Sequence, residues 1–245
     1  MPTEQIPAST LAKLAQYDTP TICNVVEVFE VRPRNVGYMN RQIQAAFPGM
    51  PPMVGFAATA TFQSSEPSSG GDAYEAIGQQ LELITNLPGP AVVVFQDLDV
   101  PSVGATFGEV MCCSFQAFGS VGLITSGGGR DLDQVCSLQY PVFTGATICS
   151  HAYSHIASLG KDVEVGGLQV RMGDLLHGDC NGVTNIPLEI ANEVADVADE
   201  FIAAEQQVIE YATQTGDKKI AELVERRRAM GNAIAVLRNR VSRQA

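Results

Sequence analysis

Residues 119–131 read Gly-Ser-Val-Gly-Leu-Ile-Thr-Ser-Gly-Gly-Gly-Arg-Asp, and the interpretation of the fold begins from this stretch. The apolar run between glycines predicts a buried strand, and the three consecutive glycines predict a turn that follows it. Arg130 offers a planar fork that binds a carboxylate at two points, and Asp131 can hold a hard cation. The stretch therefore indicates either the floor of an anion-and-metal site or a turn with two solvated charges.

The composition is that of a large globular chain with an acidic balance. Its 245 residues are 45% hydrophobic, which is enough for a sizeable core. The 27 acidic residues outnumber the 15 basic ones and give a net charge of -12. A nucleic-acid groove needs a positive field, so nucleic acid is excluded as a partner, whereas a local pocket for a small anion is not.

Neither a membrane span nor a secretory leader is recognisable in the sequence. No apolar run approaches the roughly 20 residues of a membrane helix. The six cysteines contain no CxxC pair, and a chain of this length does not need a disulfide scaffold. We therefore expect reduced, mostly buried thiols in a cytoplasmic protein without a membrane partner.

The first half of the chain alternates helical and strand-like segments. Helices are predicted over 9–17, 19–29, 73–85 and 110–118, and strands over 54–62 and 91–95. The continuous apolar run 91–95 is typical of a strand covered on both faces. The polar segment 63–72 is expected to be a surface excursion or lid. Together these segments predict a β-loop-α-β unit that leads into residues 119–131.

The second half begins with a short helix after Asp131, a strand at 141–143 and β-ribbons over 163–179, with a tight turn at 179–182. Beyond it, apolar residues recur in steps of four and three from Ile190 to Tyr211, which predicts a helical stripe. A second helix is expected over 217–243. We interpret 1–186 as an α/β domain and 187–245 as a C-terminal helical extension that packs on the domain or on a neighbouring subunit.

A second anion-binding device is predicted at Gly108-Glu109-Val110-Met111, directly before a helix. The first amides of a helix have no internal partner and, with the positive end of the dipole, bind carboxylates or phosphates. This device and the Arg130-Asp131 pair bracket one β-α-β unit. Together they could grip the two ends of an α-keto acid.

Other candidate residues are interpreted as structural. His151 and His155 would share a face of a helix, as metal ligands do, but no third ligand follows them, so we expect surface or core histidines. His177 lies in a strand-like run. Cys112 and Cys113 lack an adjacent base and are expected to pack, and the basic triplet 226–228 is expected to be a solvated helix face.

An ordered set of motifs resembles the RraA-like family, which includes 4-hydroxy-4-methyl-2-oxoglutarate aldolases and oxaloacetate decarboxylases. The resemblance covers roughly residues 10–212, and the separation of the Gly-Glu turn from the Arg-Asp pair matches without a gap. The motifs are Phe107-Gly108-Glu109, Gly119, Gly122, Gly127, Arg130-Asp131, Pro141-Val142-Phe143, Gly173-Asp174 and Asp179-Cys180-Asn181-Gly182-Val183.

The resemblance implies a compact α/β/β sandwich of the swivelling-domain type, assembled as homotrimers or hexamers with sites at subunit interfaces. It implies a divalent cation, Mg²⁺ or Mn²⁺, held by Asp131, with Arg130 on the substrate oxygens. Gly108, Glu109, Val110 and Met111 would bind the substrate, the amides around Val110 and Met111 taking its pyruvyl carboxylate. Glu205 is the candidate for an acidic residue that a neighbouring subunit contributes.

The implied activity is that of a metal-dependent lyase, an aldolase or decarboxylase that cleaves a keto acid through a pyruvate enolate. Arg130 and Asp131 would be its catalytic residues, because a developing enolate oxygen needs a preorganised cation. No lysine lies in this stretch, which fits such chemistry better than a Schiff base.

Three positions depart from the family pattern. Gln134 stands where the aldolases have a carboxylate, Ser126 where many members have Asp before the glycines, and Asn24 where many have Asp. Loss of one supporting carboxylate lowers metal affinity about 10–100-fold. The alternative function is therefore that of a non-catalytic regulator, since one branch of the family binds and inhibits a ribonuclease.

Overall fold

A mixed β-sheet forms the centre of the computed structural model, which describes residues 6–68 and 76–243. The sheet strands in the described residues are β1 (Gln44–Ala45), β2 (Met53–Gln63), β3 (Ala91–Asp97), β4 (Ala105–Phe107), β5 (Ser120–Gly129), β6 (Val142–Thr147), β7 (His155–Leu159), β10 (Leu175–Asp179) and β11 (Gly182–Ile186). Their order is β1–β6–β5–β3–β2–β10–β11, with β4 beside β5 and β7 beside β2.

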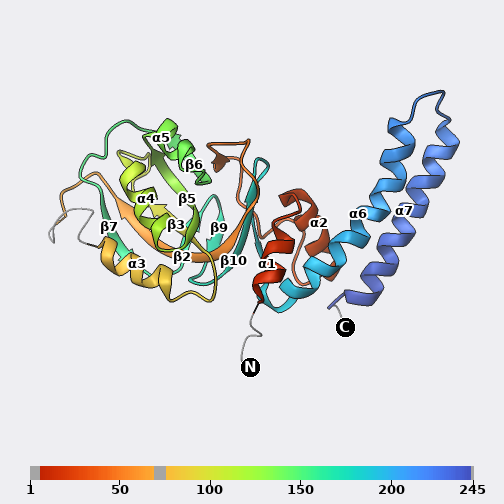
Figure 1. Cartoon of the computed structure of the whole chain (residues 1–245), viewed down its shortest axis with the longest axis horizontal. Coiled ribbons are helices and arrows are strands. Elements are labelled where there is room, and N and C mark those ends of the chain that lie inside the picture. The colour runs from red at the N-terminus through yellow and green to blue at the C-terminus, as the bar shows by residue number, and fades with distance from the viewer. Residues whose placement is uncertain (1–5, 69–75, 244–245) are drawn as a thin grey trace.

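Four neighbouring strands, β2, β3, β5 and β6, run parallel to one another. They are joined by the crossover helices α3 (Ile77–Thr85), α4 (Glu109–Ala117) and α5 (Leu132–Ser137). Figure 1 shows these three helices on one face of the sheet. Phe62, Phe95 and Phe115 lie in the apolar cluster between the helices and that face.

A two-stranded antiparallel ribbon covers the opposite face of the sheet. It consists of β8 (Val163–Val165) and β9 (Leu168–Val170). Along β3, Val93 and Phe95 pack toward the helices, whereas Val92 and Val94 pack toward the ribbon. The alternation follows the two-residue period of a strand buried on both faces. The three layers confirm the predicted α/β/β sandwich.

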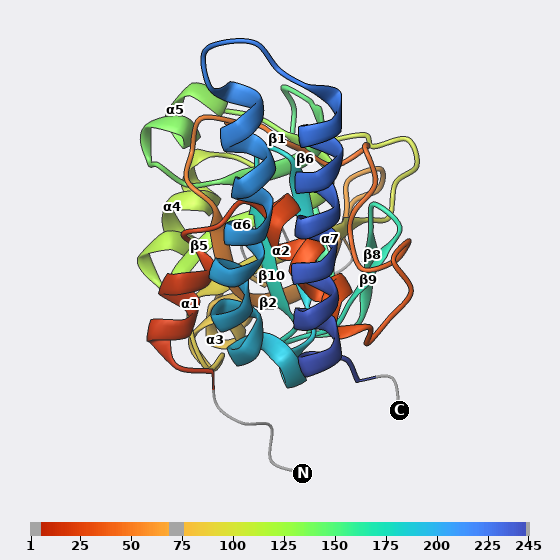
Figure 2. The same cartoon turned by 90° about the vertical axis from the view of Figure 1, so that its right-hand side faces the viewer.

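A helical region packs against one end of this sandwich. It contains α1 (Ala8–Leu14), α2 (Thr19–Phe29), a short 3₁₀ helix (Leu188–Ile190), α6 (Ala191–Thr213) and α7 (Ile220–Val241). Figure 2 shows α6 and α7 side by side, and Figure 1 shows their hairpin extending away from the sheet. The predicted helical extension is therefore present, while its boundary at residue 186 stays a prediction.

The apolar stripe of the extension packs within its own chain. Val194, Val197 and Phe201 share one buried cluster with residues of α1, α2 and α7. Further along α6, Tyr211 is also buried, and its hydroxyl accepts a hydrogen bond from the backbone amide of Lys219 at 2.8 Å. The predicted stripe thus joins the extension to the domain and closes the hairpin.

The prediction of a turn at residues 127–129 was wrong, because β5 continues through all three glycines. A Cβ atom at Gly129 would lie 1.9 Å from the ring of Phe107, and one at Gly128 would lie 2.7 Å from the side chain of Ile148. These glycines are required because neighbouring side chains fill the space above the strand. The chain turns instead at Asp131, whose φ is +54°.

Two predicted segments lie partly outside the described residues. The helix expected over 73–85 is described from Ile77 onward, and the segment 63–72 is described only to residue 68. Between α2 and β2, the chain forms the short strand β1, which pairs with β6 at the sheet edge. No helix among the described residues is both long and apolar enough to cross a membrane.

His177 links the sheet to the helical region from a fully buried position on β10. Its Nε2 donates to the carbonyl oxygen of Leu14 at 3.1 Å, so Nδ1 accepts from the hydroxyl of Thr19 at 2.9 Å. The bond in which Nδ1 accepts requires the neutral ring, because both nitrogens are donors in the charged ring. Burial lowers the pKa of His177 below its usual 6.5, because the core disfavours the charged imidazolium.

We predict that His177 makes the chain less stable in mild acid. The unfolded state binds the proton more readily, so the stability that neutral His177 provides is complete above pH 6.5 and is lost as pH falls. His177→Gln keeps a donor and an acceptor but cannot titrate. Thermal melts between pH 7.5 and 5 should therefore show a smaller drop in Tm for His177→Gln than for the parent chain. Parallel pH profiles of the two proteins would contradict this assignment.

Candidate functional site

The turn from β4 into α4 carries the first predicted binding device. Gly108 precedes the helix with an extended backbone, so its φ of -159° does not by itself require glycine. The requirement is spatial, because a Cβ atom there would lie 2.6 Å from Oδ2 of Asp131. Within the described parts of the chain, the amides of Val110 and Met111 have no hydrogen-bond acceptor. They point out of the first turn of α4, as helix geometry dictates.

The second device, the Arg130-Asp131 pair, follows directly from the end of β5. The amide of Arg130 donates to the carbonyl of Phe107 at 3.2 Å, which fixes the pair beside the end of β4. Asp131 precedes α5 in the left-handed region, a conformation that aspartate tolerates better than most residues. Side-chain exposures of 33% for Arg130 and 38% for Asp131 leave both groups accessible.

A direct hydrogen bond joins the two devices. Oδ2 of Asp131 accepts from the amide of Glu109 at 3.1 Å and lies 3.7 Å from Nε of Arg130. Its carboxylate therefore caps α4 from the neighbouring strand, where the helix dipole favours a negative charge. One of the predicted free amides is thus used internally, and those of Val110 and Met111 remain for a ligand.

A cavity of about 460 Å³ opens beside these groups. Of the predicted site residues, Gly108, Val110, Met111, Arg130 and Asp131 line it, whereas the Glu109 side chain does not. Glu109 contributes its backbone amide instead. The full lining is Pro67, Ser68, Ala105, Phe107, Gly108, Val110, Met111, Arg130, Asp131, His151, Ala152, Tyr153 and Ser154.

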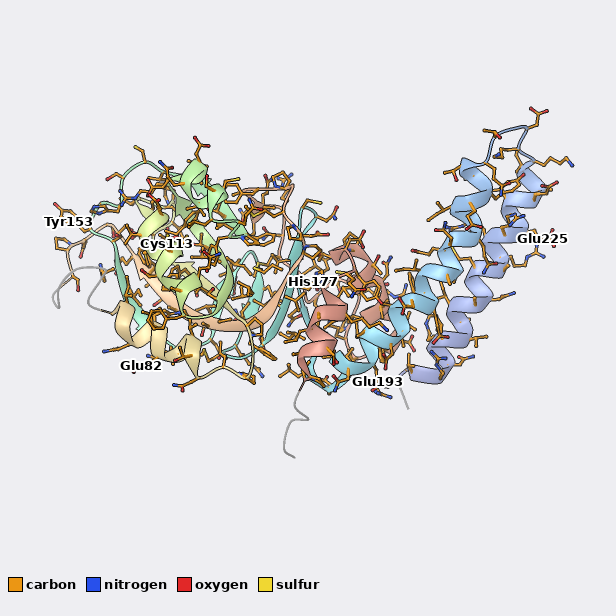
Figure 3. All side chains as sticks on the ribbon, in the orientation of Figure 1. Glu82, Cys113, Tyr153, His177, Glu193 and Glu225 are labelled. Atoms are coloured by element: carbon orange, nitrogen blue, oxygen red, sulfur yellow. The ribbon has the colours of Figure 1, made fainter. Side chains whose placement is uncertain are left out.

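The wall formed by residues 151–154 was not predicted to belong to the site. Three backbone hydrogen bonds hold this loop, from Ile148 to Gly129, from Ala105 to Ser150 and from Tyr153 to Ser64. Figure 3 shows Tyr153 at the outer tip of the domain, far from the hairpin end marked by Glu225. The pair His151 and His155 was noted in the sequence, but His155 begins β7 and does not line the cavity.

Several other candidates lie outside the cavity lining. Gln134 is exposed on α5, Asn24 is exposed on α2, and the Oγ of Ser126 accepts from the amide of Asp97. Cys112 is buried, and burial raises the pKa of its thiol well above the usual range, so it packs as a neutral group. The three departures from the family pattern therefore do not line the cavity.

Glu205 also lies away from the cavity. It belongs to α6, and the negative charge of Asp18, at the start of α2, acts together with burial to raise the pKa of its carboxyl. Figure 1 shows α6 beyond one end of the sheet, whereas α4 and α5 of the same chain cover a face of the sheet. No group of three or more His, Cys, Asp or Glu side chains able to hold a metal occurs among the described residues.

Comparison with known proteins identifies a family whose members resemble this chain. The RraA-like family model (Aldolase/RraA) matches residues 19–184. A protein of Halalkalibacterium halodurans named "Putative 4-hydroxy-4-methyl-2-oxoglutarate aldolase" is 31% identical over 101 residues, which are 41% of this chain and 47% of that protein. The chain thus matches about half the length of its curated relatives.

Solved structures share the fold at low sequence identity. An uncharacterized protein from Pseudomonas syringae pv. tomato str. DC3000 gives a TM-score of 0.71 at 21% identity, covering 93% of this chain and 97% of that one. Streptomyces coelicolor RraAS2, described as an unusual member of the RNase ES inhibitor RraA protein family, gives 0.66 at 21%, covering 87% and 100%. These likenesses establish the architecture.

We predict that Ala152→Gly stabilises the chain, because Ala152 has a φ of +47°. A left-handed backbone costs an L-residue about 1–2 kcal/mol, and glycine relieves this strain. Its greater loss of conformational entropy on folding costs only about 0.5–1 kcal/mol, so the net effect is stabilising. Thermal unfolding should show a Tm about 2 °C higher. The matched control Ala146→Gly, at an exposed position of β6 with an ordinary backbone, should lower Tm. A lower Tm for both variants would mean that the loop stores no such strain.

Proposed function

This chain belongs to the RraA-like family, and from that premise we propose that it is a divalent-metal-dependent lyase acting on keto acids. The reaction is cleavage of the C–C bond β to the ketone, with a pyruvate enolate as the first product. One observation supports this most strongly. A single cavity brings together the Arg130 guanidinium, the Asp131 carboxylate and the amides at the start of α4.

The anionic end of the substrate meets two kinds of donor. The amides of Val110 and Met111 bind a carboxylate at the positive end of α4. Arg130 offers donors in a fixed fork, of which Nε lies near Asp131, while the two terminal nitrogens reach the carboxylate or the keto oxygen. A 2-keto acid places its carboxylate and keto oxygens on adjacent carbons, which suits two neighbouring sets of donors.

The residues present fit a magnesium or manganese ion. Oδ2 of Asp131 is engaged with the Glu109 amide, so Oδ1 is the oxygen that would hold the ion. Mg²⁺ is bound in many enzymes by one or two carboxylates, with water and substrate oxygens completing the shell. A single well-oriented carboxylate beside a chelating keto acid meets that need. When bound, the ion supplies positive charge beside the oxygen that becomes negative.

Arg130 supplies a second positive charge beside the same oxygen. Cleavage moves an electron pair onto the keto oxygen, and the guanidinium stays protonated and close to it throughout. Ala105, Phe107 and Met111 form apolar walls around this position, and a water-poor wall strengthens each charge interaction. No lysine lines the cavity within the described residues, which agrees with enolate rather than Schiff-base chemistry.

We propose that the active assembly is a homotrimer or hexamer in which a neighbouring subunit completes the site. Figure 1 shows α6 apart from α4 within one chain, which supports a role for Glu205 of α6 at the cavity of another copy. The non-catalytic alternative, binding of a ribonuclease, remains the second reading. The presence of Asp131 in an accessible position beside Arg130 favours the enzyme.

We predict metal-dependent decarboxylation of oxaloacetate by the purified oligomer. Asp131→Asn and Arg130→Ala should each lower kcat on the order of 10²–10³-fold, the usual loss when a group facing the developing oxyanion is removed. Asp133→Asn is the matched control, because Asp133 is an exposed acid on α5 that does not line the cavity. The measurement is pyruvate release with Mg²⁺ and with EDTA.

Two results would contradict the proposal. If the folded oligomer turns over neither oxaloacetate nor 4-hydroxy-4-methyl-2-oxoglutarate with any divalent metal, the chain is not such a lyase, and ribonuclease binding becomes the function to test. If turnover is present but survives both substitutions, the enzyme class stands and the assignment of Arg130 and Asp131 does not.

A further inference from the structure

The cavity is larger than the pyruvyl group requires. Its volume of about 460 Å³ equals the space of about 15 water molecules at roughly 30 Å³ each. Arg130, Asp131 and the amides of α4 account for one side. Another part of the lining is the loop wall, His151 to Ser154, which is not needed to hold the keto acid itself.

The loop wall is fixed in position by its backbone. Besides the three hydrogen bonds that tie it to Gly129, Ala105 and Ser64, the amide of Ser154 donates to the carbonyl of His151 at 3.0 Å. A Cβ atom on Gly104 would lie 2.7 Å from that carbonyl oxygen, so the loop sits directly on the chain before β4. Left-handed Ala152 lies at the centre of this loop, and such strain is typical of functional sites.

The backbone also fixes the tautomer of His151. Its Nδ1 lies 2.8 Å from the carbonyl oxygen of Ala152, and because a carbonyl only accepts, Nδ1 carries the proton. In the neutral ring Nε2 is therefore a proton acceptor. No atom of residues 6–68 or 76–243 forms a hydrogen bond with it. His151 lines the cavity, and its Nε2 is available to accept a proton.

We propose that His151 is the base that accepts the proton of the 4-hydroxyl group when the substrate is a 4-hydroxy-2-keto acid. This inference rests on the proposed lyase function and extends it to aldol cleavage. Nε2 takes the hydroxyl proton, the O–H electrons form the new C4 carbonyl, and the C3–C4 bond breaks. Its electrons form the enolate, with the charge on the C2 oxygen. The imidazolium then returns the proton to C3, which yields pyruvate.

Other groups of the described lining are unsuited to this step. The guanidinium of Arg130 has donors but no acceptor, and Asp131 is committed to the Glu109 amide and to the cation. The hydroxyl groups of Tyr153 and Ser154 carry their own protons and are poor bases. A histidine with one free ring nitrogen is the side chain most often used as a general base, so His151 is the suitable group of the loop wall.

Two reactions of the same enzyme separate this role from the rest of the site. Aldol cleavage of 4-hydroxy-4-methyl-2-oxoglutarate must release a hydroxyl proton, whereas decarboxylation of oxaloacetate has none to release. His151→Asn should lower the ratio of kcat for aldol cleavage to kcat for decarboxylation about 100-fold, within the range lost with a general base. The matched control is His155→Asn, since Nδ1 of His155 also contacts a backbone carbonyl, that of Tyr153, at 2.9 Å, away from the cavity. It should leave the ratio unchanged.

A second measurement guards against a variant that merely misfolds. Added imidazole should restore aldol cleavage in His151→Ala, since it fills the space of the missing ring and acts as a base. An unchanged ratio in His151→Asn, or a wild-type enzyme that decarboxylates oxaloacetate but does not cleave the aldol, would overturn the role of His151 alone. Absence of metal-dependent turnover of both substrates by the wild type would instead overturn the lyase function itself.

Discussion

The contact between the ring of Phe107 and the backbone of Gly129 is the constraint on which the site depends. Because Gly129 has no side chain, β4 lies directly against the end of β5, with Phe107 opposite Gly129. The residues that follow each strand are therefore brought close together. Gly108 precedes α4, Asp131 follows β5 by two residues, and the hydrogen bond from the Glu109 amide to the Asp131 carboxylate follows from that proximity.

Side-chain hydroxyl groups stabilise the same end of β5 through hydrogen bonds to its carbonyl oxygens. Thr106 donates to the carbonyl of Gly128 at 3.0 Å, and Thr144 donates to that of Gly127 at 2.7 Å. Below Gly127 lies Asp97, whose Oδ2 is buried without a partner in the described structure and whose pKa is raised by burial. The two hydroxyl hydrogen bonds hold the strand end that precedes Arg130 and Asp131 in position, as a preorganised charge site requires.

The sequence was sufficient for those features that depend on neighbours along the chain. The apolar run 91–95 predicted a strand buried on both faces, and Arg130-Asp131 with the start of α4 belong to one β-α-β unit, whose geometry brings them together. The reason for glycine at positions 128 and 129 could not be predicted from the sequence, because the atoms that exclude a Cβ there belong to β4 and to Ile148. The loop wall was missed for the same reason. His151 reaches the cavity through backbone contacts with distant strands, which leave no periodic signal in the loop itself.

The two walls of the cavity divide the chemistry between them. In the lyase that we propose, Arg130, Asp131 and the α4 amides would act on the pyruvyl end, where every substrate of this class develops the same negative oxygen. They would lower the barrier for loss of carbon dioxide and for loss of a carbonyl compound alike, so they would not choose between these reactions. The choice depends on the far end of the substrate, where one leaving group must give up a proton and the other carries none. Both reactions break the same C3–C4 bond and differ in the leaving group. If His151 receives that proton as proposed, the strained loop determines which leaving group the shared enolate chemistry releases.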